Sequence, residues 1–445
     1  MRSSLSLLAL SLCLTVTPVM AQAQAPAPAH AATQSLTAEA RDQALATIKA
    51  ALTENYVFPE KTAAIISALD AANHAGRYTV DDPQTFAGRV TADMLAASQD
   101  HHLYLTYDPR RFQAAMSTPD DDQGIEGFDA ARARLDNYGL TDQRILAGNI
   151  RYLKISGFEW VKDETGAAYD GAMRFLKGGD AIIIDLRGNG GGDAAAVRYL
   201  VSHFMAPDTL ELTFWAGRTA SQSRTLDYLP AGRLDGKPLY VLIDGHVASA
   251  GESFAYDVQQ FKLGKLVGRT TLGAANNNKF IPVAPGFLLS VSFGRPVHPV
   301  SGGNWEGAGV APDVAVNPRQ ALATAELLAI DALAAKPGVT ADARRTLAWA
   351  RTGAAAELNP VTLPQTTLAA MAGTYDDVVL TYRDGALWLS RPSQPIWPQD
   401  ARLTPLTADG LFAVEGMDML RVQPTDKGLE LWWSNEETPR LKARK

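Results

Sequence analysis

The chain has 445 residues, of which 46% are hydrophobic and 20% charged, so it is long enough for two or three domains and is not a single small module. Its 41 Lys and Arg residues against 48 Asp and Glu residues give a formal charge of −7, which disfavours nucleic acid or anionic lipid as a general partner. One Cys and seven His exclude a Cys-rich zinc site and leave few ligands for a His-rich one.

Residues 1–25 predict a secretory signal peptide. They contain one Arg, an apolar run from Leu5 to Val19, and small residues at alternating positions that offer more than one cleavage point. The single Cys, Cys13, lies in this run, so cleavage would leave a mature chain without Cys, stabilised by core packing and not by disulfides. An uncleaved membrane anchor is the alternative. No later stretch approaches the roughly 20 apolar residues that span a bilayer, and we expect a soluble exported protein, periplasmic or secreted.

The next segments predict a helical region followed by an α/β core. Residues 26–34 are a Pro/Ala-rich linker, and residues 35–110 are expected to form an N-terminal helical subdomain whose first helix begins near Thr37. Within the expected core, 145–320, buried strands are predicted at 149–158, 180–188 and 238–245, and helices at 194–204 and 249–261. Strand followed by helix, repeated, indicates an α/β fold that binds ligands at the carboxyl ends of its strands.

The rest of the chain predicts two further units. Short β segments are expected at 265–270, 279–283 and 287–293, and a helical segment at 321–358. Two prolines within 359–364 mark a boundary. Beyond it, alternating apolar residues around Asp384 and Gly385 predict a hairpin, and 365–445 is expected to be a small antiparallel β domain.

The most distinctive string is DLRGNGGGD, residues 185–193. Three consecutive glycines after a buried strand permit positive φ and leave N–H groups uncovered, so the loop can present donors to a ligand oxygen. It is not a phosphate loop, because no Lys-Ser/Thr follows and the dinucleotide-binding spacing is absent. A plain tight turn is the alternative.

A serine follows the strand at 238–245, much as the glycine loop follows the strand at 180–188. Ser249, in GHVASAGES, lies at the start of a helix, where the helix dipole and the free N–H of Ala250 favour an oxyanion. The alternative is an N-cap residue. As a nucleophile, Ser249 would need a base.

The histidines limit the choice of base. His246 and His298 lie near the motif segments and are either bases or ordinary loop residues. His101 and His102 follow a helical stretch and precede an alternating strand, a junction that can aim one imidazole into a cleft. Adjacent histidines in an extended chain point to opposite sides, which disfavours a metal site. His30 lies in the linker and His74 between helices, whereas His203 is expected to end a helix and to interact with its dipole.

Together these segments resemble the tail-specific, or C-terminal-processing, serine peptidases, in the branch with the tricorn core protease and the interphotoreceptor retinoid-binding protein repeats. The matching segments, in order across about 100–316, are IRYLKISGF, DLRGNGGG, IDGHVASAGESFAY, VGRTTLGAAN and NWEGAGVAPDVAV. The resemblance implies a crotonase-like ββα core with an N-terminal helical subdomain and a lipocalin-like C-terminal β domain.

The resemblance also implies the catalytic residues. Ser249 is the expected nucleophile. The lysine base of the C-terminal-processing branch is absent, since its position holds Ala274 and Lys279 lies five residues later in another context. A histidine base is therefore implied, with His102 as the base and Glu306 as the carboxylate that completes the network.

The remaining site residues follow from the same resemblance. Asp100 belongs to the D-x-H stretch that supplies the base, and His101 occupies the position of a serine in the tricorn-like network, which leaves the fourth member unassigned. Glu252 is a secondary candidate for orienting groups near the site. The expected oxyanion hole consists of the Ala250 N–H with that of one further residue, either Gly191 or Gly192.

The expected reaction is hydrolysis of peptides or unfolded proteins through an acyl-enzyme, without cofactor or metal. About 40 residues separate Pro109 from Asn149, too few for an inserted PDZ domain, so tail specificity is not expected. Two alternatives stay open: a non-catalytic binder of apolar ligands on the same fold, and a serine esterase, although V-A-S-A-G departs from the esterase motif G-x-S-x-G.

Overall fold

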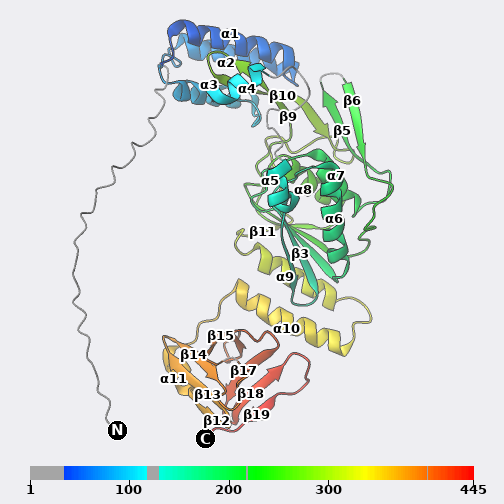
Figure 1. Cartoon of the computed structure of the whole chain (residues 1–445), viewed down its shortest axis with the longest axis vertical. Helices are drawn as coiled ribbons and strands as arrows, with labels where there is room; N and C mark the ends of the chain where they lie inside the picture. Colours follow the sequence, from blue (N-terminus) through cyan, green and yellow to red (C-terminus); the bar gives the residue numbers. More distant parts are fainter. Residues whose placement is uncertain (1–34, 118–129, 217–218, 398) are drawn as a thin grey trace, which may run out of the picture.

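The computed structural model describes residues 35–117, 130–216, 219–397 and 399–445. The expected signal peptide and linker, together with Cys13 and His30, lie outside these described residues. Figure 1 shows three parts along the long axis, with helices at one end, an α/β unit in the middle and a β unit at the other end. Within the described ranges, no helix combines the length and apolarity needed to cross a membrane.

The N-terminal part is helical, as expected. Thr37 caps the first helix by accepting a hydrogen bond from the N–H of Ala40, which confirms the predicted start. The buried face of this helix packs with Phe287 and Leu289 of a strand far along the chain. The helices are α1 (Ala38–Asn55), α2 (Pro59–His74), α3 (Pro83–Ser98) and α4 (Pro109–Ser117).

The strands that these helices cover belong to a five-stranded sheet, ordered β1-β10-β5-β6 with β9 also paired to β10. They are β1 (Tyr104–Tyr107), β5 (Leu210–Ala216), β6 (Thr219–Arg224), β9 (Asn277–Val283) and β10 (Phe287–Val297). Because β1 pairs with β10 from Tyr104 to Tyr107, residues 100–102 are brought beside the chain that precedes β9 and follows β10.

The central sheet has six strands in the order β11-β8-β7-β4-β3-β2, parallel except for the β2–β3 pair. The strands are β2 (Leu140–Leu146), β3 (Ile150–Ile155), β4 (Ala181–Asp185), β7 (Leu239–Ile243), β8 (Lys265–Gly268) and β11 (Val314–Ala315). Every residue of β4 and β7 is buried, which is why their continuous apolar runs predicted them.

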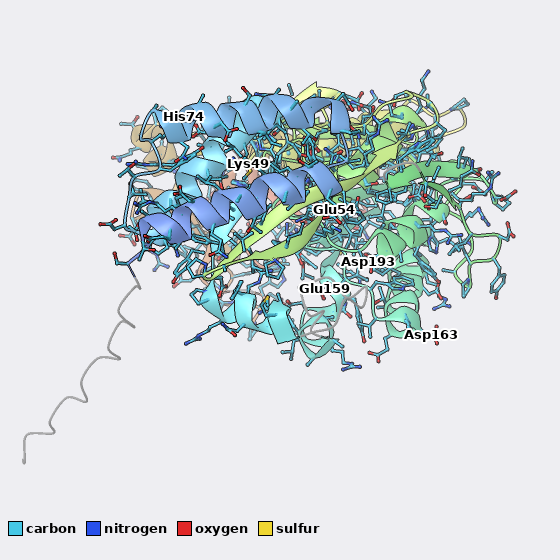
Figure 2. All side chains as sticks on the ribbon, turned by 90° about the horizontal axis from the view of Figure 1, so that it is seen from above. Lys49, Glu54, His74, Glu159, Asp163 and Asp193 are labelled. Carbon is cyan, nitrogen blue, oxygen red and sulfur yellow. The ribbon has the colours of Figure 1, made fainter. Side chains whose placement is uncertain are left out.

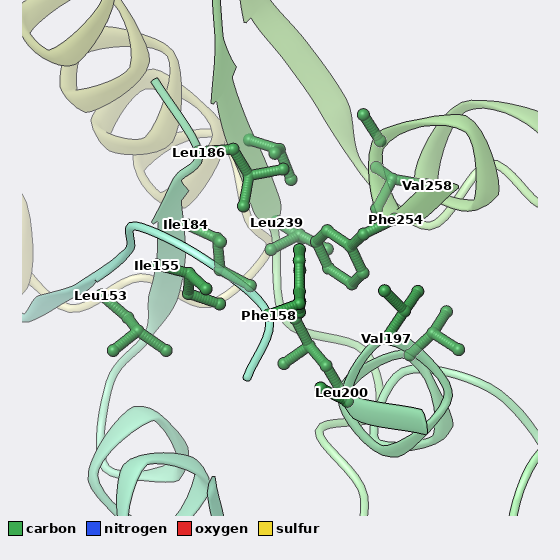
Figure 3. Close-up of a cluster of buried hydrophobic side chains, with 14 of the residues drawn as sticks. Leu153, Ile155, Phe158, Ile184, Leu186, Val197, Leu200, Leu239, Phe254 and Val258 are labelled. Atoms are coloured by element: carbon green, nitrogen blue, oxygen red, sulfur yellow. The ribbon is translucent and has the colours of Figure 1, made fainter. Parts of the chain in front are cut away.

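Helices cover both faces of this sheet. Alternate residues of β3, β4 and β7 pack against α6 (Lys162–Lys177), α7 (Ala194–Ser202) and α8 (Ala250–Gln260) on one face. Figure 3 shows part of this cluster, with Ile155, Ile184 and Leu239 from the strands facing Val197 and Phe254 from the helices. The intervening residues pack against α9 (Ala321–Ala334) and α10 (Ala341–Leu358) on the other face.

The C-terminal part is an eight-stranded antiparallel meander preceded by α11 (Gln365–Met371). Tyr375 on its first strand bridges to Arg444 near the end of the chain, so the sheet nearly closes into a barrel, and apolar side chains fill its interior. The predicted hairpin is confirmed, because Asp384 and Gly385 both have positive φ between paired Arg383 and Ala386. The strands are β12 (Gly373–Tyr375), β13 (Val378–Arg383), β14 (Ala386–Ser390), β15 (Ala401–Pro405), β16 (Phe412–Val414), β17 (Leu420–Thr425), β18 (Gly428–Trp433) and β19 (Arg440–Lys442).

Several elements were not predicted. These are β2, β5, β6, β11, α4, α6, α11 and the short helices α5 (Ala130–Leu135) and η1 (Asn137–Gly139). The edge strand β2 is mostly exposed, so its sequence has no apolar run. Helix α6 contains Gly166 and Gly171, which lower its intrinsic helix propensity.

Candidate active site

Ser249 lies in the turn that links β7 to α8, and its backbone conformation is unusual. Its φ of 51° and ψ of −118° place a non-glycine residue in a region that costs about 1–3 kcal/mol, and such strain concentrates at functional sites. A sharp turn between strand and helix also presents a nucleophilic serine in hydrolases of another fold. Ser249 occupies the N-cap position of α8 as well, so the capping alternative describes its place correctly but does not account for the strain.

The glycine loop after β4 lies directly against this turn. A Cβ atom at Gly191 would come within 2.8 Å of Ser249 Cβ and 3.1 Å of the Ala250 nitrogen. Gly191 also has a φ of 109°, so both the space and the conformation require glycine. Gly192 likewise has positive φ and leaves no room for a side chain, since its Cβ would clash with the carbonyl of Phe158. The loop is therefore more than a tight turn, because it forms one wall of the serine site.

Two backbone donors of the expected oxyanion hole are uncommitted. The Gly191 N–H donates to Asn189 Oδ1 at 2.8 Å, while Asn189 Nδ2 donates to the carbonyl of Ile155. Neither Ala250 N–H nor Gly192 N–H has a hydrogen-bond acceptor among the described residues. The geometry therefore favours Gly192 over Gly191 as the glycine that could donate to a ligand oxygen. Asn189, which the motif contains but the sequence analysis did not single out, holds the loop to β3.

Glu252 is hydrogen-bonded both to the turn that contains Ser249 and to a second loop, residues 271–276. Its carboxylate is fully buried and accepts hydrogen bonds from Thr271 Oγ1 at 2.5 Å, Gly273 N–H at 2.6 Å, Ala274 N–H at 2.8 Å and Ser249 N–H at 3.0 Å. Burial raises the pKa of Glu252, and these four donors oppose that rise by stabilising the charged form. The residue thus lies where an orienting role for Ser249 was expected.

Three other predicted residues, Asp100, His102 and Glu306, form a cluster that contacts this loop through Glu306. One ring nitrogen of His102 and one carboxylate oxygen each of Asp100 and Glu306 lie within 4.8 Å of one another. Asp100 Oδ1 accepts the N–H of His102 at 2.9 Å, and Glu306 Oε1 accepts the N–H of His101 at 3.3 Å. The side chain of His101 is exposed, and its hydrogen bond to Glu306 comes from the backbone.

Burial dominates the electrostatics of this cluster. It lowers the pKa of His102, against the opposing effect of the Asp100 carboxylate, and so favours the neutral imidazole that a general base requires. Burial and the neighbouring Asp100 charge raise the pKa of Glu306 to about 7, although backbone donors partly offset them.

The loop at 271–276 connects the two halves of the site. Glu306 Oε2 accepts the N–H groups of Ala275 at 2.6 Å and Asn276 at 2.9 Å, the two residues that follow those bound by Glu252. The described residues show no hydrogen bond between Ser249 Oγ and the His102 ring. Glu252, which also binds Ser249 N–H, and Glu306, which lies in the cluster with His102, therefore both bind this one loop. Ala274, at the position of the lysine in other peptidases, is buried in this loop, and Lys279 is exposed on β9.

The other described histidines do not take the place of the base. His246 is exposed, and His298 is buried with its Nε2 3.5 Å from Asp257 Oδ1; burial lowers the pKa of His298 to about 4. His203 ends α7 as expected and its Nδ1 contacts the carbonyl of Tyr199. His74 ends α2 at the outer surface (Figure 2). In the ranges that the structure describes, none of them is hydrogen-bonded to Ser249.

Comparisons with known proteins agree on one family. The family model described as "Peptidase family S41" matches residues 149–316, and that described as "N-terminal domain of Peptidase_S41 in eukaryotic IRBP" matches residues 31–129. The carboxy-terminal processing protease CtpB of Bacillus subtilis (strain 168) is 25% identical over 189 residues, which cover 42% of this chain. The match spans only 38% of the length of that relative.

Three solved structures match parts of the chain. The photosystem II D1 C-terminal processing protease is 16% identical with a TM-score of 0.41, and the match covers 62% of this chain and 93% of that one. A putative peptidase from Parabacteroides merdae ATCC 43184 is 19% identical with a TM-score of 0.44, covering 62% and 90%. The tricorn protease is 14% identical with a TM-score of 0.41, covering 64% and 35%.

Proposed function

The chain belongs to peptidase family S41, and from that premise we propose that it is an exported serine peptidase that cleaves peptides or unstructured proteins through an acyl-enzyme. The family assignment confirms the resemblance inferred from the motifs. The observation that carries the proposal is the strained Ser249 turn, packed against Gly191 and beside the uncommitted N–H of Ala250. Export is inferred from residues 1–25, whose composition is that of a signal peptide.

In the proposed mechanism, His102 accepts the proton of Ser249 Oγ as the hydroxyl attacks a peptide carbonyl. The same imidazole then donates the proton to the leaving amine, and water hydrolyses the acyl-enzyme. The hydrogen bond between His102 and Ser249 Oγ would form in the substrate complex, because catalytic hydrogen bonds often tighten only when substrate binds. Glu306, with Asp100, would stabilise the imidazolium that forms.

The developing oxyanion would accept hydrogen bonds from Ala250 N–H and Gly192 N–H. Each such donor contributes on the order of 100-fold or more to the rate. Glu252 would act as a positioning residue, since it binds the backbone of Ser249 and not the substrate. The proposed mechanism needs no cofactor.

In this proposal the catalytic residues come from two of the expected domains. His102 comes from the helical subdomain (35–110), and Ser249 and Glu306 come from the core (145–320). The segments 321–358 and 365–445 supply no catalytic residue. We do not propose tail specificity, because the interval from Pro109 to Asn149 is short for a PDZ domain.

A fluorophosphonate probe and an unstructured peptide substrate test the proposal. The full-length mature protein should react with the probe and cleave the peptide, and Ser249→Ala should abolish both. Ser221→Ala, which changes an exposed serine on β6, is the matched control and should leave both unchanged. A folded protein that neither labels nor cleaves would refute the peptidase and favour a binder of apolar ligands. Labelling with cleavage of small esters but not peptides would favour an esterase.

A further inference from the structure

The cluster of Asp100, His102 and Glu306 has a second chemical property besides proton transfer. It places one imidazole nitrogen and two carboxylate oxygens within 4.8 Å of one another, a donor set that transition metals bind. The adjacency of His101 and His102 in the sequence disfavours a metal site made by that pair. The structure uses only one of that pair and adds Asp100 and Glu306, so that objection does not apply.

Buried polar atoms in this cluster lack partners. Asp100 is 1% exposed, and among the described residues neither its Oδ2 nor the buried Nδ1 of His102 has a hydrogen-bond partner. The buried hydroxyl of Tyr56 interacts with Asp100, but without a hydrogen bond of normal geometry. Buried polar atoms are costly when unsatisfied, and a bound cation would satisfy the carboxylate and the imidazole together. Glu306 Oε1 accepts a single hydrogen bond, from His101 N–H, and so retains a lone pair.

We propose that Asp100, His102 and Glu306 form a binding site for a divalent transition-metal ion such as Zn²⁺, and that occupancy inhibits the peptidase. Zinc binds His nitrogen and carboxylate oxygen at about 2.0–2.2 Å and accepts three protein ligands with a fourth position open. The three side chains would have to approach by on the order of 1 Å to reach such distances. Magnesium and calcium prefer oxygen ligands alone, so the imidazole selects against them.

The proposed inhibition by the metal rests on the proposed peptidase function, whereas the proposed metal binding does not. A metal on the His102 ring would occupy a lone pair of the base and oppose its protonation by positive charge. It would also hold Glu306 and Asp100 away from an imidazolium. Ser249 is not a ligand, so metal binding should be the same in a protein that cannot react.

Calorimetric titration of the full-chain Ser249→Ala protein with ZnCl₂ tests the binding. We expect one Zn²⁺ per chain, and at least about tenfold weaker binding when Asp100→Asn or Glu306→Gln is added. His246→Ala, which removes an exposed histidine near the serine turn, should leave the affinity within about twofold. Circular dichroism establishes that each variant is folded, and MgCl₂ should give no binding.

In the protein that retains Ser249, saturating Zn²⁺ should slow fluorophosphonate labelling at least about tenfold, and EDTA should restore it. The site is refuted if Zn²⁺ does not bind, or if Asp100→Asn and Glu306→Gln bind as tightly as the parent. The inhibitory role is refuted if labelling continues at full rate with zinc bound, or if EDTA abolishes it. Absence of labelling without metal would refute the peptidase function and leave the binding result in force.

Discussion

The pKa of Glu211 tests how burial and the neighbouring Asp257 on α8 affect a carboxyl group in this core. Glu211 lies on β5, is 2% exposed, and accepts one hydrogen bond, from Ser223 Oγ at 2.6 Å. Its neighbour Asp257, on α8, is completely buried, and neither of its carboxylate oxygens has a hydrogen-bond partner among the described residues. Burial and the Asp257 carboxylate raise the pKa of Glu211 to about 8.

A raised carboxyl pKa makes the folded state less stable as the pH increases. Below about 4.5 the carboxyl of Glu211 is protonated in both the folded and unfolded chain, and the full stability is present. Between 4.5 and 8 only the folded state keeps the proton, so the free energy of unfolding falls by about 1.4 kcal/mol per pH unit. The free energy of unfolding falls by at most about 5 kcal/mol over the whole interval, and by about 3–4 kcal/mol between pH 5 and 8, because titration is partial near each pKa.

The variant Glu211→Gln removes this titration while keeping a carbonyl oxygen for the Ser223 hydroxyl. Thermal unfolding should give similar melting temperatures for parent and variant at pH 5. At pH 8 the variant should melt about 6–12 °C higher, which corresponds to about 3 kcal/mol for a unit of 150–250 residues. The control Glu54→Gln, on the exposed surface of α1 (Figure 2), should follow the parent at both values.

Comparison of the two proteins isolates Glu211, because every other titrating group is present in both. If Glu211→Gln melts no higher than the parent at pH 8, Glu211 is ionised without penalty in the folded protein and the reasoning from its burial is wrong. An equal gain in Glu54→Gln would show that general charge, and not burial, controls the pH dependence.

Three further changes test the site and the fold. Gly191→Ala forces a Cβ to 2.8 Å from Ser249 Cβ and should slow fluorophosphonate labelling at least about 100-fold, whereas Gly190→Ala, which meets no atom within 4 Å, should label normally. Glu252→Gln turns an amide NH₂ toward at least one backbone N–H and should lower kcat for peptide cleavage more than it raises KM, with the circular dichroism spectrum retained. Thr37→Ala removes the cap of α1 and should cost about 1 kcal/mol in denaturant unfolding of the helical part, without a change in labelling.

The sequence predicted most reliably the elements that are buried on both faces. Strands β4 and β7 have every residue buried, so their apolar runs could not be mistaken for a surface segment. Strands β2 and β6 were missed because they lie at sheet edges with mostly exposed side chains, where β pairing needs no apolar pattern. The hairpin at Asp384 and Gly385 was predictable because positive φ at both turn positions restricts the choice of residue.

For the candidate site, short sequence motifs predicted the Ser249 turn and the glycine loop, but not which residues far apart in the sequence contact each other. The position of Ser249 followed from a strand, a turn and a helix within a dozen residues, and that of the glycine loop from three consecutive glycines. The role of Glu252 as acceptor of four hydrogen bonds could not be read from spacing, because three of its donors lie about 20 residues away. Likewise, the Asp100 and Glu306 carboxylates become neighbours only through the pairing of β1 with β10.

The loop at 271–276 determines how the two halves of the site can meet. Four consecutive N–H groups, from Gly273 to Asn276, are divided between two carboxylates, Glu252 on the Ser249 side and Glu306 on the His102 side. In the proposed mechanism, these bonds would hold the Glu306 carboxylate within reach of the His102 imidazole. A lysine at the position of Ala274 could instead supply a base from the loop itself. With alanine there, the loop offers no such base, and the proposed mechanism takes the base from His102 instead.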